Sequence, residues 1–303
     1  MLPNKRITPA NHHWWPQSLS KSWVGADGGV TQLSWDESEV RSKPSNFAAI
    51  RNAHHITRGN DSPWNTTFEP VFDKADSTFP DLVDWLLTIE ASTSRSKSSF
   101  HDRFRVQSLS GDRRAQLAEC LSSLVVRSPR SRNNIKITIE SYLSNDNIEE
   151  HYVDKTLIAA NMHASHGIFT SVINGGGRFI ALICDESELV YGDGFLHNFP
   201  IGTDRPISGR FIIPVLPSLA ILFVQPLAYR PQPELITMRL HEKEVTFLNQ
   251  IVQVYSKNHI FYRNIKPKII EEFRRREHLE LTYHQHPWIE HLINSALDFV
   301  PKV

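Results

Sequence analysis

Hydrophobic positions in the second half of the chain either alternate with polar ones or run without interruption, and both patterns predict β-strands. An apolar strand covers residues 179–184, followed by a polar turn at 185–187 and a return strand at 189–191. Residues 211–224 predict two further short strands. Together these segments predict an antiparallel sheet of roughly five to seven strands.

Apolar positions spaced three and four residues apart predict helices around these strands. One begins near Thr78 with Pro80 in an early position, and one follows Asp112 and ends before Pro129. The remaining predicted helices cover residues 46–54, a stretch from Asn145 or Asp146 to about His166, a strongly amphipathic stretch starting at Glu242, and residues 267–279 and 287–299.

The N-terminal segment has a different character, since it concentrates histidines, tryptophans and a proline in residues 11–16. Pro16 favours an extended conformation before it, and residues 30–35 alternate like a strand. We expect the two tryptophans to fasten this segment to the core. We also expect the segment to join or cross the main sheet, which would bring His13 near Asp193.

These elements predict the α+β class: an antiparallel sheet with helices packed on one face and a helical C-terminal end. We expect a single α+β domain over residues 1–262 and a C-terminal helical extension, residues 263–303, packed on it. Hydrophobic and charged residues make up 40% and 22% of the 303 residues, and these values are typical of a globular protein.

Charge is balanced overall but not along the chain. The formal net charge is zero, which excludes a polycation that would bind nucleic acid through its total charge. Residues 95–136 hold ten Lys/Arg against three Asp/Glu, whereas residues 137–200 hold two against nine. The two blocks either compensate each other in the fold or mark an anion-binding face and an acidic face.

The cysteines and the N-terminal residues predict the compartment of the protein, which we expect to be reducing. Two cysteines, Cys120 and Cys184, lie in apolar settings and predict buried thiols, with neither a disulfide framework nor a zinc site. The N-terminus lacks the apolar core of a signal peptide, and no run of about 18 apolar residues indicates a membrane span. We therefore expect a soluble, cytoplasmic protein.

His12 and His13 are the first candidate catalytic residues. Neighbouring residues of an extended segment point to opposite sides, so one histidine can face a polar cleft while the other cannot share it. The alternative is a hydrogen-bonded structural histidine beside core aromatics, and the sequence leaves the two interpretations about equal.

Glu90 and Asp193 are candidate catalytic and metal-binding carboxylates. Glu90 continues the apolar stripe of Leu82 and Leu86, where an unpaired carboxylate would be costly, although the helix end could also place it in solvent. Asp193 lies between Gly192 and Gly194 after a strand, where backbone can approach closely, but a tight turn has the same composition.

Candidate substrate-binding residues follow one helix and lie on another. Arg127, Arg130 and Arg132 could hold phosphate, although such a run is more often a solvated loop. Asn249 lies near the apolar stripe of the helix that starts at Glu242. His163 and His166 have a spacing that can hold a metal, without further ligands at a recognisable spacing.

Several of these stretches, in this order, resemble a large bacterial family catalogued as domain of unknown function 4238. The resemblance rests on His12-His13-Trp14-Trp15-Pro16, the helix ending in Glu90, Arg127-Ser128-Pro129-Arg130, the 179–184 strand leading to Gly192-Asp193-Gly194, Ile213-Pro214-Val215-Leu216-Pro217, and Asn249. It extends to about Tyr262. Trp14-Trp15 replaces the family's Tyr-Val, and Gly192-Asp193-Gly194 replaces its Ser-Asp-Asn without the proline that follows. The family label implies no reaction, but it points to the same histidines and carboxylates.

Two classes of function remain open. The first is an intracellular hydrolase, a nuclease-type toxin or phage-defence effector, in which His and Asp/Glu side chains act with or without a divalent metal. Imidazole and carboxylate ligands would suit Mg²⁺, Mn²⁺ or Zn²⁺, in that order of preference. Nucleic acid would then be a partner through residues 127–132. The second is a non-enzymatic module that binds a protein or nucleic-acid partner and uses its polar residues as a structural network.

Overall fold

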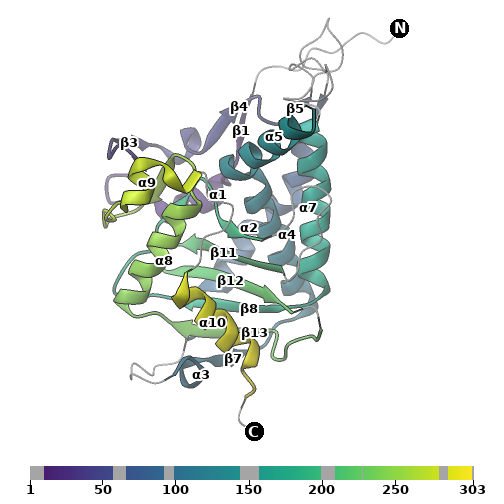
Figure 1. Ribbon diagram of the computed structural model, residues 1–303, viewed down its shortest axis with the longest axis vertical. Coiled ribbons are helices and arrows are strands. Elements are labelled where there is room, and N and C mark those ends of the chain that lie inside the picture. Colours follow the sequence, from purple (N-terminus) through teal and green to yellow (C-terminus); the bar gives the residue numbers. More distant parts are fainter. Residues whose placement is uncertain are drawn as a thin grey trace, which may run out of the picture.

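A computed structural model describes residues 10–56, 66–91, 99–143, 157–198, 209–226, 228–279 and 286–301 (Figure 1). Its main sheet has six described strands in the order β10-β11-β12-β8-β13-β7. Their bounds are β7 Arg105–Gln107, β8 Arg178–Ile183, β10 Leu196–His197, β11 Gly209–Leu216, β12 Leu219–Gln225 and β13 Leu235–Arg239. All neighbouring pairs are antiparallel except β8 and β13, which are parallel. The predicted α+β class is confirmed, as are the strands predicted within residues 179–184 and 211–224.

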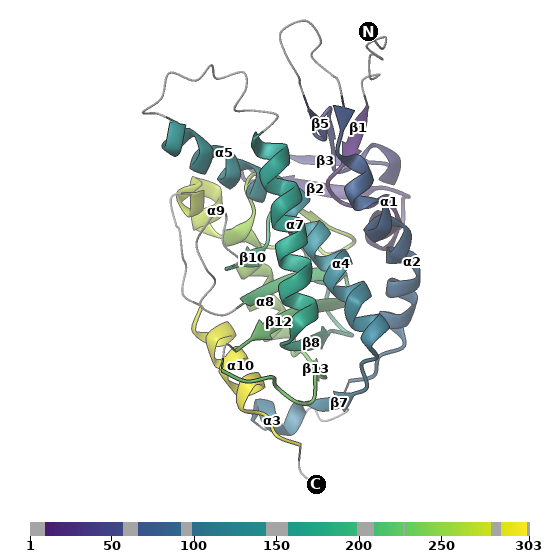
Figure 2. The same cartoon turned by 90° about the vertical axis from the view of Figure 1, so that its right-hand side faces the viewer.

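Both faces of this sheet are covered by helices. Neighbouring residues of a strand point to opposite faces. On β8, Phe179 lies under the guanidinium of Arg114 from α4 (Gly111–Arg127), 5.3 Å from the ring centroid. The preceding residue, Arg178, donates to the carbonyl oxygens of Ala296 and Phe299 at the end of α10 (Pro287–Asp298). Helices therefore pack on two faces of the sheet, where the pattern predicted one (Figures 1 and 2).

The predicted return strand at 189–191 does not pair with β8. Both edges of β8 are already taken, by β12 and β13. The chain instead enters a second sheet as β9 (Tyr191–Gly192), which pairs with β14 (His259–Tyr262). This sheet has the order β3-β2-β14-β9, with β2 at Val30–Ser34 and β3 at Glu39–Ser42. The strand predicted at 30–35 is thus confirmed, whereas the hairpin prediction is wrong.

Strands before α2 also form two separate two-stranded sheets. Strand β1 (Asn11–His13) pairs with β4 (Ala49–Arg51), and β5 (His55–Ile56) pairs with β6 (Thr66–Thr67). The helix predicted over residues 46–54 is wrong, because left-handed φ angles of 55° at Ala48 and 57° at Asn52 interrupt any helical run. The prediction that the N-terminal segment joins the main sheet is also wrong. Its tryptophans are buried as expected, and Trp15 stacks on Tyr191 with ring centroids 4.2 Å apart.

The short helices α1 (Gln17–Ser20) and η1 (Lys21–Trp23) and the turn η2 (Pro44–Asn46) connect these strands. After η3 (Glu69–Phe72), α2 runs from Asp73 to Leu87, so it begins five residues before the predicted start and contains Pro80 within it. Helix α3 (Phe100–Arg103) precedes β7. Helix α4 is capped by Ser110 and not by Asp112.

Helix α5 (Pro129–Leu143) follows α4 after a single residue. Proline at the first helical position costs no hydrogen bond, since that N–H has no partner within the helix. The interpretation of residues 127–132 as a solvated loop is therefore wrong. Helix α7 covers Ile158–Gly175, and the start predicted at Asn145 or Asp146 lies outside the described residues.

The C-terminal part contains α8 (Glu242–Tyr255), confirmed at its predicted start, a short α9 (Glu271–Arg275), η5 (Glu277–Leu279) and α10. Buried residues of α10 such as Leu292 belong to the same hydrophobic core as the main sheet and α4. Cys120 and Cys184 are buried and unbridged, as predicted. None of the helices in the described parts of the chain combines the length and apolar character that a membrane crossing requires.

Candidate functional site

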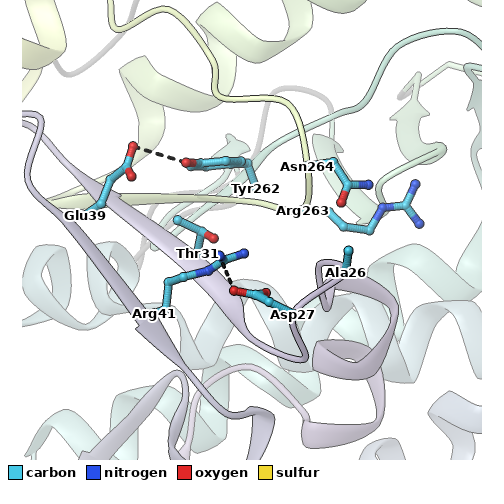
Figure 3. Close-up of a pocket in the computed structure, with 8 residues that line it drawn as sticks. All are labelled: Ala26, Asp27, Thr31, Glu39, Arg41, Tyr262, Arg263 and Asn264. Carbon is cyan, nitrogen blue, oxygen red and sulfur yellow. Dashed lines mark hydrogen bonds and ion pairs between the residues drawn. The ribbon is translucent and has the colours of Figure 1, made fainter.

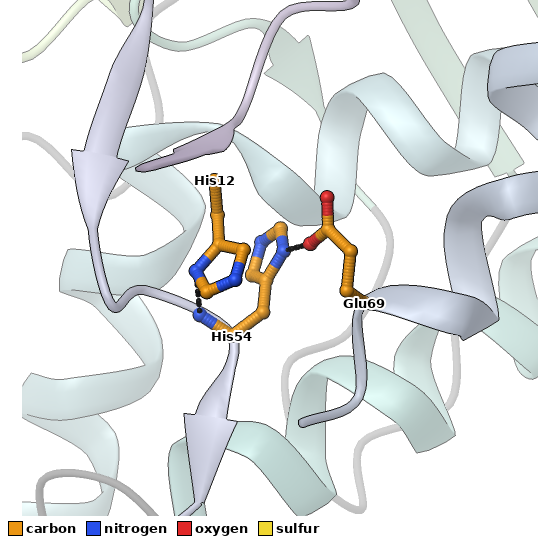
Figure 4. A group of neighbouring side chains, drawn as sticks. All are labelled: His12, His54 and Glu69. Atoms are coloured by element: carbon orange, nitrogen blue, oxygen red, sulfur yellow. Dashed lines mark hydrogen bonds and ion pairs between the residues drawn. The ribbon is translucent and has the colours of Figure 1, made fainter. Parts of the chain in front are cut away.

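Two histidines and a glutamate from three separate segments meet at one end of the fold (Figure 4). His12 is the buried residue of β1, His54 immediately precedes β5, and Glu69 is the first residue of η3. One ligand atom from each residue lies within 4.8 Å of the others. We call these three residues the His-His-Glu cluster.

Direct contacts join the members of the cluster. The Nδ1 atom of His54 is hydrogen-bonded to the Glu69 carboxylate, and the backbone amide of His54 donates to Nδ1 of His12 at 3.1 Å. The two imidazole rings stack with centroids 4.9 Å apart and planes inclined by 23°. The cluster is therefore a chain of contacts and not three side chains that happen to be near one another.

The backbone around His54 is fixed on both sides. Its carbonyl oxygen accepts hydrogen bonds from the Phe68 amide at 2.9 Å and from the Thr67 hydroxyl at 3.0 Å. The same hydroxyl accepts the Glu69 amide at 3.2 Å. Since both partners are held through Thr67, the orientation of the imidazole relative to the carboxylate is set before any ligand arrives.

Burial decides the protonation of the cluster. It lowers the pKa of His12 to about 4, and it also lowers the pKa of His54 although Glu69 acts in the opposite direction. Burial alone would raise the pKa of Glu69, but the hydrogen bond and charge of His54 and the charges nearby bring it below its usual value. At neutral pH the cluster thus holds two neutral imidazoles and one carboxylate.

Tautomers follow from these contacts. A neutral imidazole has one N–H and one lone pair. Nδ1 of His12 accepts an amide, so its proton is on Nε2, where it can be donated. Nδ1 of His54 faces a carboxylate, so it carries the proton, and its Nε2 presents a lone pair. His54 therefore has the arrangement of a general base oriented by a carboxylate.

Two arginines, Arg127 and Arg132, place positive charge near the cluster. Arg127 lies over Phe72, with the guanidinium carbon 4.8 Å from the ring centroid, and the same ring packs 5.3 Å from that of His54. Arg132 donates to the carbonyl oxygen of Ala53 at 2.7 Å, next to His54 in sequence. Both arginines contribute to the lowered pKa of His54, so their field reaches the site.

A second buried pair, His166 and Glu119, also lies near Phe72. The ring of His166 meets Phe72 edge-on at 5.4 Å, and its Nε2 lies 3.4 Å from Oε1 of Glu119. His163 is exposed on the same helix. Because one histidine faces the core and the other faces solvent, the spacing of His163 and His166 does not form a common metal site.

Of the predicted catalytic residues, His12 lies in the cluster and His13 lies beside it. The ring Nε2 of His13 is 3.3 Å from the Ser45 carbonyl oxygen, on the other side of β1. Glu90 follows the end of α2 and is 73% exposed, with its carboxylate 2.7 Å from Arg105. Of the two interpretations left open for Glu90, the solvent-exposed helix end holds and the core-facing position does not, since the helix ends at Leu87 and the apolar stripe ends with it.

Asp193 is buried, but its partners are backbone groups. Its carboxylate accepts the amides of Lys257 and Asn258, the latter at 3.0 Å, and its own amide donates to the His259 carbonyl oxygen at 3.1 Å. Burial raises the pKa of this carboxylate, against the effect of the two amides. These contacts are those of the structural turn that the sequence left open as an alternative.

The flanking glycines have a packing role. A Cβ atom on Gly192 would lie 1.8 Å from the Ser256 hydroxyl, and one on Gly194 would lie 2.2 Å from the Tyr255 carbonyl oxygen. The bend therefore fits tightly against the end of α8. The expected convergence of His12 or His13, Glu90 and Asp193 in one hollow is not found, because each has a different set of contacts.

Predicted substrate-binding residues also have internal partners. Arg127 is buried and forms a two-pronged ion pair with Asp76, at 2.6 and 3.0 Å. Arg130 donates to the His278 carbonyl oxygen at 3.2 Å. Asn249 bonds to backbone of the segment before β9, at the Val190 amide and the Glu188 carbonyl. Their predicted role in binding substrate stays a prediction.

A cavity of about 290 Å³ lies elsewhere, between β2, β3 and the segment after β14 (Figure 3). Its charged side chains are already paired, Asp27 with Arg41, Glu39 with Lys266, and Arg263 with Glu188. None of the predicted site residues lines it. The cavity therefore offers no uncompensated charge to a ligand.

His54 and Glu69 were missed in the sequence because nothing in their spacing marks them. They are 15 residues apart, and His54 is 42 residues from His12. The signals present were the pair His54-His55 and a glutamate before Pro70. Comparison of the chain with family models, curated proteins and solved structures finds no match. The resemblance to domain of unknown function 4238 stays a prediction from short motifs.

Proposed function

We propose that the chain is a hydrolase of the nuclease type whose chemistry is carried by the His-His-Glu cluster. The observation that supports this most is the hydrogen bond of His54 Nδ1 to the Glu69 carboxylate. Such a bond fixes the tautomer that leaves Nε2 as a base and stabilises the imidazolium that forms when a proton is taken.

In the proposed reaction, Nε2 of His54 removes a proton from water, and the oxygen attacks the scissile centre. The P–O bond to the leaving oxygen breaks, and this oxygen takes the proton from the His54 imidazolium, whose charge Glu69 stabilises. The Nε2–H group of His12 donates a hydrogen bond to the negative charge that develops. The side chain of Glu69 is 32% exposed while the imidazole of His54 is 2% exposed. Of this pair, Glu69 is therefore the more accessible to solvent.

The substrate class follows from charge. Arg127 and Arg132 lie near the histidines, and Arg127 shares its charge with Asp76 while Arg132 binds a backbone carbonyl. A positive field of this kind favours a phosphodiester over a neutral ester or an amide. A role as a toxin or phage-defence effector in the cytoplasm belongs to the same proposal, with nucleic acid as partner.

One observation favours the alternative, a non-enzymatic module that binds a partner. His12 and His54 are almost completely buried, and the pKa values of both are lowered, as expected for imidazoles that stabilise a fold. If so, changes in the cluster would alter stability without a reaction to lose, and binding to nucleic acid would depend on salt alone.

The test is cleavage of single-stranded and double-stranded DNA and RNA by purified protein, with His54→Gln as the variant and His291→Gln as its control. His291 is exposed on α10 and is not part of the cluster. We expect His54→Gln to lower the cleavage rate about 100-fold to 10,000-fold, the usual contribution of a general base. Cleavage that is equal in both variants, with thermal unfolding showing both folded, would contradict the proposal.

A further inference from the structure

We propose that His12, His54 and Glu69 bind a divalent cation of the Zn²⁺ class, through one imidazole nitrogen of each histidine and one carboxylate oxygen. The proposal deepens the proposed function and rests on it for the use of the ion in catalysis. Binding itself rests on geometry: one donor atom from each of the three residues lies within 4.8 Å of the others.

The donor set determines which ion fits. Two nitrogens and one oxygen suit Zn²⁺, whereas Mg²⁺ prefers oxygen ligands and keeps much of its water. The sequence led us to expect Mg²⁺ or Mn²⁺ at Glu90 and Asp193. In the structure the Glu90 carboxylate pairs with Arg105, and the Asp193 carboxylate accepts two backbone amides. Three protein ligands leave a fourth tetrahedral position for water, as in catalytic zinc sites.

The ligands are in the protonation state that a metal requires. Zn²⁺ binds the lone pair of a neutral imidazole and an ionised carboxylate. In the cluster, Nδ1 of His12 presents a lone pair to the His54 amide, and the Glu69 carboxylate accepts the hydrogen bond of His54. Ligation through Nδ1 of His54 would place its proton on Nε2. His54 would then be a ligand and not the base, and the water held by the ion would supply the nucleophile of the proposed hydrolysis.

Two features of the cluster work against the binding of a cation. Nδ1 of His12 accepts the His54 amide, so ligation through this atom replaces one hydrogen bond at 3.1 Å. Arg127 and Arg132 repel a cation, but Arg127 is paired with Asp76. Of the described residues, no other histidine, cysteine or acid joins a group of three with donor atoms this close.

The experiment is a calorimetric titration with ZnCl₂ of full-length protein that has first been treated with chelator and dialysed. Wild type, Glu69→Gln, His12→Gln and the control His291→Gln are compared, with circular dichroism confirming that each is folded. We expect one equivalent of Zn²⁺ per wild-type chain, an affinity at least about 10-fold weaker in each cluster variant, and no change in His291→Gln.

Glutamine at position 69 keeps an acceptor for the His54 proton, so this variant separates ligand charge from folding. Wild type that binds no stoichiometric Zn²⁺, or cluster variants that bind it as well as wild type does, would overturn the proposal. The binding assay contains no substrate. A protein that binds Zn²⁺ and does not cleave nucleic acid would therefore refute the proposed function and leave the metal site standing.

Discussion

At the scale of single residues, the carboxylates of Asp193 and Glu69 differ in what they bind. The carboxylate of Asp193 is occupied by the amides of Lys257 and Asn258. The carboxylate of Glu69 is occupied by the imidazole of His54, which in turn has a second nitrogen. An acid that binds only backbone stabilises a turn, whereas an acid that orients an imidazole can support proton transfer.

This difference predicts that Asp193→Ala destabilises the fold. Two partly buried amides would lose their acceptor, and each unsatisfied buried donor costs about 1–3 kcal/mol, an upper range here. Chemical unfolding should show this loss in Asp193→Ala and none in Asp84→Ala, where the carboxylate is exposed on α2. Equal stability of the two variants would show that the carboxylate is not structural and would reopen its catalytic interpretation.

The residues of the site were only partly predictable. His12 could be found because a strand exposes alternate residues, so one of two adjacent histidines had to face inward. Glu90 was misplaced because the stripe of Leu82 and Leu86 continues in the sequence for a turn beyond the end of the helix. His54 and Glu69 depend on pairing between β1 and β4 and between β5 and β6, which no local pattern specifies.

At the scale of elements, strands and helices with one clear apolar pattern were predicted correctly. The sheet to which a strand belongs was not, because it depends on which other strand it pairs with. The strands β8, β11 and β12 and the start of α8 agree with their apolar patterns. The return strand after β8 was assigned to the wrong sheet, because period and turn residues do not reveal that β8 is already paired on both sides. Helix α5 was missed because Pro129 both ends one helix and begins another.

The bend that follows β9, at Gly194, gives a prediction at this scale because it packs against Arg130 of α5 and Tyr255 of α8. Gly194→Ala places a Cβ within 2.4 Å of the Arg130 Cβ and closer still to the Tyr255 carbonyl oxygen, so α5 or α8 must shift. We expect a loss of about 1–3 kcal/mol in the free energy of unfolding, as for other overpacked sites. Gly167→Ala, on α7 with open space around it, should be neutral or slightly stabilising. A stable Gly194→Ala protein would argue against this close approach.

At the scale of the whole molecule, the first turn of α5 connects the two polar centres. The Arg130 amide donates to the Asp193 carbonyl oxygen at 2.9 Å, and two residues later Arg132 binds the backbone beside His54. The turn at Asp193 therefore helps to place α5, and α5 helps to place the cluster. Asp193 can influence the site through position while remaining outside it.

The two charge blocks do not simply neutralise each other. Several arginines of the basic block pair with carboxylates outside the acidic block: Arg103 with Glu244, Arg113 with Asp81, Arg114 with Glu234 and Arg127 with Asp76. In the acidic block, Asp185 and Glu188 pair with Arg239 and Arg263. These ion pairs connect segments that are far apart in the sequence. The partners could not be predicted from the net charge of the two blocks.

The central claim is that His54 and Glu69 act as one catalytic unit, and a double-mutant cycle on the cleavage rate tests it most directly. The four proteins are wild type, His54→Gln, Glu69→Gln and the double variant, each confirmed as folded. If Glu69 acts by orienting His54, the double variant should cleave no more slowly than His54→Gln, because the carboxylate has no base left to orient. Losses that multiply in the double variant, or single variants that cleave like wild type, would contradict the account.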